Sequence, residues 1–237
     1  MRRIFLPLLL VLVLSLAACG GDEEPESSDT VAATMEDSSS GTGGATTEAS
    51  SGAGGCETVE APEPKQDGGQ TAPTASLDPG TTYELVVETN CGGFTITLDP
   101  ELAPKTTASL VALAEDGFFD DLTFHRIVPG FVIQGGDPTG TGTGGPGYTT
   151  VDVPPPGAGY TKGVVAMAKG GIDPPGSSGS QFFVVTADDA GLPPDYAIVG
   201  EVTEGLGVVE TIGTLGDPAT EQPLEPVVIE KITVETS

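Results

Sequence analysis

The sequence predicts a mainly β protein whose folded part, residues 80–237, is an antiparallel barrel of about eight short strands with two helices. Three observations predict this class. Short apolar runs with the pattern of β-strands recur from residue 81 onward. Loops rich in Gly and Pro separate them, and the 237 residues include 35 Gly and 21 Pro. Only two stretches favour a helix. A barrel suits such strands because closure removes exposed sheet edges.

A hairpin and a helix open the folded part. Residues 83–89 form the first predicted strand, and residues 94–98 alternate apolar and polar side chains as the second. The turn between them is Asn90–Gly93. A helix follows, because Pro104 suits a first helical position, apolar residues then recur at i, i+3 and i+4, and Gly117 suits its end.

The other elements are shorter. A second helix is expected over residues 205–212. Residues 138–162 are rich in Gly and Pro, contain little apolar material and are expected to form a surface loop. The remaining strands are predicted over residues 122–128, 131–134, 163–168, 181–185, 197–202 and 227–234.

The N-terminus predicts export. A basic start, Met1-Arg2-Arg3, precedes an apolar run of 15 residues over 4–18, which is short for a bilayer span but typical of a signal-peptide core. The run ends in Leu16-Ala17-Ala18-Cys19, which resembles the lipobox of bacterial lipoproteins. This resemblance implies that residues 1–18 are a signal peptide and that Cys19 carries the lipid. The protein would then be extracytoplasmic and lipid-anchored to the cell membrane. An ordinary secretory signal and an uncleaved anchor are the alternatives.

Residues 19–79 predict a linker. They consist mainly of Gly, Ser, Thr, Ala, Glu and Pro, with almost no apolar periodicity. Such a segment buries too little apolar surface to offset the entropy of ordering, so it is expected to be disordered. A flexible coil of about 60 residues reaches roughly 40–45 Å. The expected role is to hold the domain away from the membrane.

The charge excludes one class of partner. The chain has 8 Lys and Arg against 35 Asp and Glu, a net charge of −27 at pH 7. A nucleic-acid surface needs clustered basic residues, so nucleic acid is not expected as a partner. Within residues 80–237 the only Arg is Arg126.

Two cysteines remain once Cys19 is set aside. Because an exported chain meets an oxidising environment, Cys56 and Cys91 are candidates for a disulfide that closes a loop of about 35 residues. Two free thiols are the alternative. Two Cys and one His do not make a four-ligand zinc site, so no metal is expected.

The segment from Phe124 to Asp137, Phe-His-Arg-Ile-Val-Pro-Gly-Phe-Val-Ile-Gln-Gly-Gly-Asp, closely resembles the signature of the cyclophilins, a family of peptidyl-prolyl cis-trans isomerases. Four further segments match the family in order: Ala103–Thr106, Gly142–Gly145, Gly179–Phe183 and Tyr196–Gly200. The match spans about 81–236. It implies a closed eight-stranded barrel capped by two helices, with the site on the outer face of the sheet. It also implies a monomer without a cofactor that acts on proline-containing segments of unfolded or exported proteins and assists their folding.

The resemblance assigns roles residue by residue. Arg126, Phe131 and Gln134 match the catalytic positions, with Arg126 as the donor to the prolyl nitrogen and Gln134 as the group that steers it. The positions that match substrate contacts are His125, Val132, Gly142, Ala168, Lys169, Gln181, Phe183, Leu192 and Tyr196.

Several alternatives accompany these assignments. His125 suggests acid–base work, but isomerisation transfers no proton, so a lining or bracing role is favoured. Gly140–Gly145 also fits a dinucleotide fingerprint, but Pro146-Gly147-Tyr148 follows where a helix is needed. A non-catalytic holdase that binds proline peptides is the second hypothesis. A lipoprotein that delivers a small molecule is the third, and it would need a deep enclosed pocket.

Overall fold

A computed structural model describes residues 55–237, in which every element of the predicted domain is found. The predicted signal peptide, Cys19 and the linker up to residue 54 lie outside the described residues. In the described part of the chain, neither helix is long and apolar enough to cross a membrane.

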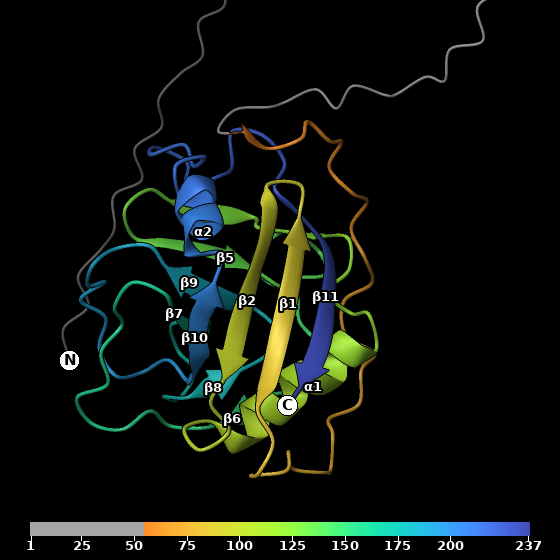
Figure 1. Cartoon of the computed structure of the whole chain (residues 1–237), viewed down its shortest axis with the longest axis vertical. Coiled ribbons are helices and arrows are strands. Elements are labelled where there is room, and N and C mark those ends of the chain that lie inside the picture. Colours follow the sequence, from red (N-terminus) through yellow and green to blue (C-terminus); the bar gives the residue numbers. More distant parts are fainter. Residues whose placement is uncertain (1–54) are drawn as a thin grey trace, which may run out of the picture. The chain divides into compact units, whose positions relative to one another are not determined.

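The main element is a nine-stranded sheet in the order β3-β11-β1-β2-β10-β7-β9-β5-β4, all of whose neighbours are antiparallel (Figure 1). Its strands are β1 (Tyr83–Thr89), β2 (Gly92–Leu98), β3 (Leu122–Thr123), β4 (Arg126–Val128), β5 (Val132–Gly135), β7 (Val164–Met167), β9 (Phe182–Val185), β10 (Ile198–Glu204) and β11 (Val228–Thr236). A small second sheet pairs β6 (Thr150–Val151) with β8 (Ser177–Ser178). The helices are α1 (Pro104–Glu115) and α2 (Leu206–Gly213).

The expected closed barrel of eight strands is wrong: the sheet is curled but open, with β3 and β4 at its edges. The predicted strand over residues 122–128 is divided into these two short strands, which raises the count to nine. Only Phe124 and His125 separate them, so β3 and β4 are consecutive pieces of one stretch of chain and cannot pair with each other. Phe124 instead donates its backbone N–H to Val227 O at 2.9 Å. Phe124 and His125 therefore connect the two edge strands β3 and β4 covalently, and no ladder of hydrogen bonds closes the sheet between them.

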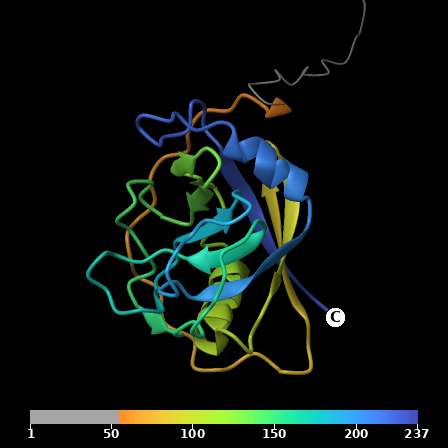
Figure 2. The same ribbon diagram turned by 90° about the vertical axis from the view of Figure 1, so that its left-hand side faces the viewer.

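Residues 56–70, here called the strap, lie along the domain instead of continuing the expected linker (Figures 1 and 2). A disulfide joins Cys56 to Cys91 in the β1–β2 turn. Further along, the backbone N–H groups of Lys65, Gly68 and Gln70 donate to carbonyls of residues 138–146. The strap buries little apolar surface, as its composition indicates, but backbone hydrogen bonds and one covalent bond hold it in place.

Strands β5 and β9 bury side chains on both faces of the sheet. Within β9, Phe182 and Val184 belong to the main core, which lies between the sheet and the helices, whereas Phe183 and Val185 belong to a second apolar cluster. β5 is divided in the same way between Ile133 and Val132. Because side chains alternate between the faces of a strand, the second cluster occupies the outer face of the sheet.

Candidate active site

A pocket of about 250 Å³, here called the apolar pocket after the side chains of its floor, opens over this second cluster. Nine of the residues assigned by resemblance line it together: Arg126, Phe131, Val132, Gln134, Ala168, Lys169, Phe183, Leu192 and Tyr196. They come from four separate parts of the chain, and strands β4, β5 and β9 supply the floor.

The register of the sheet positions the polar and apolar halves of the pocket. Arg126 on β4 lies directly opposite Gln134 on β5, which lies opposite Phe183 on β9. The row continues from Phe183 to Ala166 on β7. Directly opposed residues in a sheet point to the same face. The guanidinium, the amide and the aromatic ring therefore stand side by side on the outer face.

Two side chains hold the guanidinium of Arg126. Its Nε donates to Glu221 Oε2 at 2.7 Å, and its Nη1 donates to Gln134 Oε1 at 3.4 Å. The Arg126 side chain is 34% exposed, so the ion pair stands at the rim of the pocket in contact with solvent. Contacts from two directions fix the plane of the guanidinium above the apolar floor.

Glu221, which lies 95 residues away from Arg126, is not among the predicted site residues. A hydrogen bond holds the backbone of Glu221 beside β4, because Ile127 N donates to Glu221 O at 2.8 Å. Glu221 has a φ of 60°, a left-handed conformation uncommon for a side chain other than Gly or Asn. The loop thus delivers its carboxylate to the residue next to Ile127. One acid in a loop rich in polar residues offered no sequence signal for this pairing.

A glycine-rich loop, residues 137–147, stands beside the pocket and is organised by one buried carboxylate. Asp137 accepts the backbone N–H groups of Thr139, Gly142 and Gly144, and also the Thr139 hydroxyl. A Cβ on Gly144 would lie 2.2 Å from Asp137 Oδ1, so only Gly allows this approach. Burial by itself raises the pKa of Asp137, but the four hydrogen bonds outweigh it and hold the pKa below its ordinary value.

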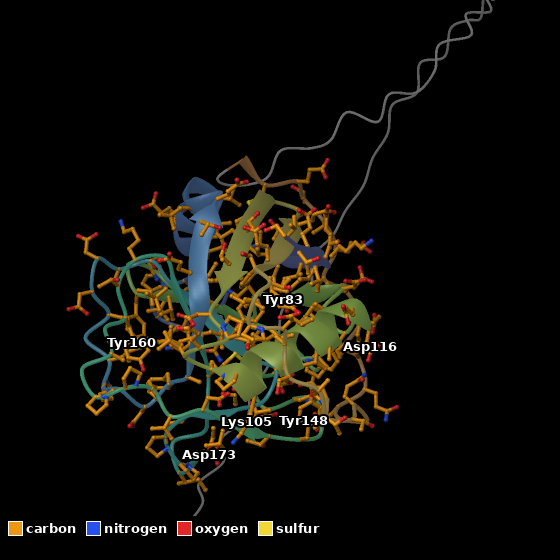
Figure 3. All side chains as sticks on the ribbon, turned by 60° about the horizontal axis from the view of Figure 1, so that its bottom comes forward. Tyr83, Lys105, Asp116, Tyr148, Tyr160 and Asp173 are labelled. Carbon is orange, nitrogen blue, oxygen red and sulfur yellow. A yellow bond between two sulfur atoms is a disulfide. The ribbon has the colours of Figure 1, made fainter. Side chains whose placement is uncertain are left out.

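Beside this loop lies a second depression of about 590 Å³, here called the groove. Gln181 and Gly142, which the resemblance places beside the residue before proline, line the groove rather than the apolar pocket. Gln134, Ala168 and Lys169 line both depressions, so the two adjoin. Figure 3 shows two further groove residues, Tyr148 and Asp173, at the lower side of the view.

A chain of side-chain hydrogen bonds connects the groove to Arg126. Gln181 Nε2 donates to Gly144 O at 2.9 Å, and Gln134 Nε2 donates to Gln181 Oε1 at 3.0 Å. Gln134 in turn accepts from Arg126. The position of the glycine-rich loop therefore bears on the position of the guanidinium.

One loop residue braces the far wall of the pocket. Tyr160, within the predicted surface loop 138–162, is fully buried in the second cluster. Its hydroxyl donates to Tyr196 O at 2.7 Å and accepts from Tyr196 N at 3.1 Å. Part of that loop is thus core, contrary to expectation, and it fixes the pocket residue Tyr196.

His125 lies apart from the residues that line either depression. Both ring nitrogens are buried without a hydrogen-bond partner among residues 55–237. A Cβ on Gly142 would lie 3.8 Å from Nε2, which places the ring beneath the glycine-rich loop. Burial lowers the pKa of His125; the Asp137 carboxylate and the backbone of Thr123 oppose this shift, and the Arg126 charge adds to it. A bracing role fits this position.

These pKa shifts predict a stability that falls with acidification in two steps. Above pH about 6.5, His125 is neutral in both states and contributes no pH dependence. Below it, the unfolded chain binds a proton that the folded chain resists, so stability falls. A second loss begins below about pH 3.8, the ordinary pKa of an Asp such as Asp137, as that carboxylate protonates.

Urea unfolding between pH 7.5 and 5 measures the first step. It should vanish in His125→Phe; an equally steep decline in that variant would contradict the assignment.

Between the sheet and the helices, a space lined by residues such as Leu110, Phe119 and Val199 measures about 10 Å³, roughly one water molecule. Within residues 55–237, no group of three or more His, Cys, Asp or Glu is placed to hold a metal ion. The hypothesis of a small-molecule carrier therefore gains no support from the interior.

The curled antiparallel sheet with its two helices has counterparts among solved structures. A cyclophilin type peptidyl-prolyl cis-trans isomerase from Cryptosporidium parvum superposes with a TM-score of 0.60 at 30% identity, covering 65% of this chain and 98% of that one. The same protein solved in the presence of the dipeptide Ala-Pro matches with the same score.

Sequence comparison agrees. The family model described as "Cyclophilin type peptidyl-prolyl cis-trans isomerase/CLD" matches residues 84–234. Peptidyl-prolyl cis-trans isomerase B of Streptomyces anulatus is 43% identical over 169 residues, which are 63% of this chain and 95% of the relative. Peptidyl-prolyl cis-trans isomerase A of Mycobacterium tuberculosis is 40% identical over 174 residues, 66% of this chain and 94% of the relative. The chain belongs to the cyclophilin family, the enzymes that interconvert the cis and trans forms of X-Pro bonds.

Proposed function

We propose that the protein isomerises X-Pro bonds in exported or cell-surface proteins, from a position tethered to the outside of the cell membrane through lipid on Cys19. The lipobox-like Leu16-Ala17-Ala18-Cys19 supports the tether. The cyclophilin domain follows that signal in the same chain, so its substrates are the unfolded segments present on that side of the membrane.

The catalytic mechanism follows from what the X-Pro bond needs. Rotation passes through a twisted state about 18–20 kcal/mol above the ground state, because amide resonance is lost. No covalent bond breaks, so the enzyme accelerates the reaction by binding the twisted state more tightly than either planar form. In that state the prolyl nitrogen regains a basic lone pair, and a guanidinium N–H can donate to it.

The observation that carries the proposal is the position of Arg126 at the rim of an apolar pocket. Phe131, Val132 and Phe183 provide a surface for the pyrrolidine ring. Glu221 and Gln134 hold the guanidinium in place before substrate arrives. A donor oriented in advance costs little reorganisation as the barrier is climbed, which is the source of most electrostatic catalysis.

The test is the refolding of an exported protein whose slow phase is limited by an X-Pro bond. Uncatalysed isomerisation takes about 10–100 s, so the slow phase is easily timed. The chain is expected to shorten it at substoichiometric concentration. A holdase, the alternative function, would bind the unfolded protein and leave the rate of the slow phase unchanged or lower it.

The tether is tested by replacing the lipidated residue. The Cys19→Ala variant is expected to leave the membrane fraction, because one lipid-bearing residue supplies the proposed anchor. Fractionation of cells that express each form, followed by immunoblotting, measures the distribution. Cys56→Ala is the matched control and should stay with the membrane. Membrane retention of Cys19→Ala would contradict the lipid anchor.

Glu221 is proposed as a positioning residue. Its replacement in Glu221→Ala removes one of two groups that orient Arg126, and we expect kcat to fall about tenfold with KM little changed, because small misplacements of a catalytic group are costly. Glu221→Gln keeps an acceptor oxygen and should recover most of the rate. Glu210→Ala, which breaks the surface pair with Lys162, is the control. A wild-type kcat in Glu221→Ala would remove Glu221 from the mechanism.

A further inference from the structure

One wall of the groove comes from outside the cyclophilin match. The family model begins at residue 84, yet Asp67 of the strap lines the groove together with Gly142, Gln181 and Asp173. The segment that leads from the proposed membrane anchor thus contributes directly to the depression beside the catalytic pocket.

Two hydrogen bonds at Gly145 and a close approach at Gly147 join the strap to the glycine-rich loop. Gly145 N donates to Asp67 Oδ1 at 2.9 Å, and Gly145 O accepts from Gly68 N at 2.9 Å. A Cβ on Gly147 would lie 3.0 Å from Gly69 N and 3.1 Å from Gly68 Cα, and Gly147 has a φ of 92°. Both reasons favour Gly at this position. The contact that brings Asp67 to the groove is therefore specific to these two segments.

The groove adjoins the proposed proline site, so a bound peptide can extend into it. It adjoins the apolar pocket through Gln134, Ala168 and Lys169. With proline in the pocket and the preceding residue beside Gln181 and Gly142, the next residue toward the N-terminus of the substrate enters the groove. The strap then faces the second residue before proline.

The charges along the groove favour a cation. Three charged side chains line it: Asp67, Asp173 and Lys169. The ammonium of Lys169 donates to the carbonyls of Gly170 and Asp173 and lies 5.6 Å from the centre of the Tyr196 ring. Asp173 accepts from Gly170 N at 2.9 Å. Lys169 and Asp173 belong to the same short loop, whereas Asp67 belongs to the strap and is exposed.

We propose that the strap is part of the substrate site and that Asp67 is a specificity-determining residue, which favours Lys or Arg as the second residue before proline. The inference rests on the proposed function. Both partners stay accessible to water, so the preference is moderate: exchanging Lys for Glu at that substrate position should change kcat/KM about three- to tenfold. The preference should shrink as salt is raised, because exposed charges are screened.

The test compares two capped tetrapeptides, Lys-Ala-Pro-Phe and Glu-Ala-Pro-Phe, with the full chain in detergent and cis/trans exchange followed by NMR. The measured quantity is the ratio of kcat/KM for the Lys peptide to that for the Glu peptide. Asp67→Asn removes the charge but keeps an acceptor for Gly145 N, and Asp67→Lys reverses the charge. Glu63→Gln and Glu63→Lys make the same charge changes at an exposed strap position that does not line the groove.

The expected ratio is about three to ten for the wild type, close to one for Asp67→Asn and below one for Asp67→Lys. Both Glu63 variants should keep the wild-type ratio. A wild-type ratio of one, with both peptides isomerised, overturns the inference and leaves the proposed function intact. A high ratio that survives in Asp67→Asn also overturns it. If neither peptide is isomerised, the proposed function fails and the inference fails with it.

Discussion

Replacing Arg126 by Ala is expected to lower kcat/KM for a proline tetrapeptide about 10²–10³-fold, the usual cost of removing one donor aimed at a developing charge. The pocket keeps its apolar floor, so the planar peptide should still bind and KM should change little. Arg126→Lys keeps the charge but loses the planar guanidinium that donates to Glu221 and to Gln134 at the same time. It should therefore recover only part of the rate. Exchange spectroscopy on the peptide measures all three forms.

A charge-matched control separates catalysis from general electrostatics. Lys162→Ala removes another cation, one paired with Asp188 and Glu210 at the surface and absent from the lining of the pocket. Its activity should equal that of the wild type. Full activity of Arg126→Ala, in a protein with an unchanged unfolding temperature, would rule out the proposed donor.

Replacing Asp137 by Ala is expected to cost about 3 kcal/mol of unfolding free energy, because the N–H groups of Thr139, Gly142 and Gly144 lose a charged acceptor. Activity should fall as well, since Gly144 O anchors Gln181 and, through it, Gln134. Urea unfolding followed by circular dichroism measures the stability.

Asp188→Ala is the comparison for Asp137→Ala. The Asp188 side chain is 99% exposed, and surface substitutions of this kind change stability by about 0.5 kcal/mol or less. If Asp137→Ala were as stable as Asp188→Ala, the carboxylate would not be organising the glycine-rich loop.

The parts of the fold that the sequence predicts are those set by local patterns. Residues 83–89 and 94–98 form the expected hairpin β1–β2, because alternation and a turn with two Gly determine it locally. Closure of the sheet was predicted wrongly, since the break at Phe124 and His125 depends on pairing with β11, about 100 residues away. No local pattern reports such a distant partner.

The candidate site shows the same division. The resemblance placed Arg126, Gln134 and Phe183 in one pocket, and the structure brings them together in one row across three strands. It gave no indication of Glu221, whose role depends on a left-handed backbone in a distant loop. The ordered course of the strap was not predicted, because composition indicates only how much apolar surface a segment can bury. Backbone N–H groups and a disulfide hold the strap instead.

Acidic residues outnumber basic ones in the domain that holds Arg126. Residues 55–237 contain 27 acidic residues against six basic ones, and Arg126 is the only Arg among them. Glu221 accepts from Nε of the guanidinium, and Gln134 accepts from Nη1. One acid thus orients the cation, and a negative surface suits cationic substrate segments through long-range attraction.

The most direct test of the account measures cis/trans exchange of a proline tetrapeptide by NMR, with the wild-type chain and with Arg126→Ala at equal concentration. We expect exchange cross-peaks with the wild type within mixing times far shorter than the uncatalysed time of about 10–100 s, and their loss in the variant, while both forms still shift the peptide resonances on binding. Binding without exchange in the wild-type protein would contradict the isomerase mechanism and favour a holdase.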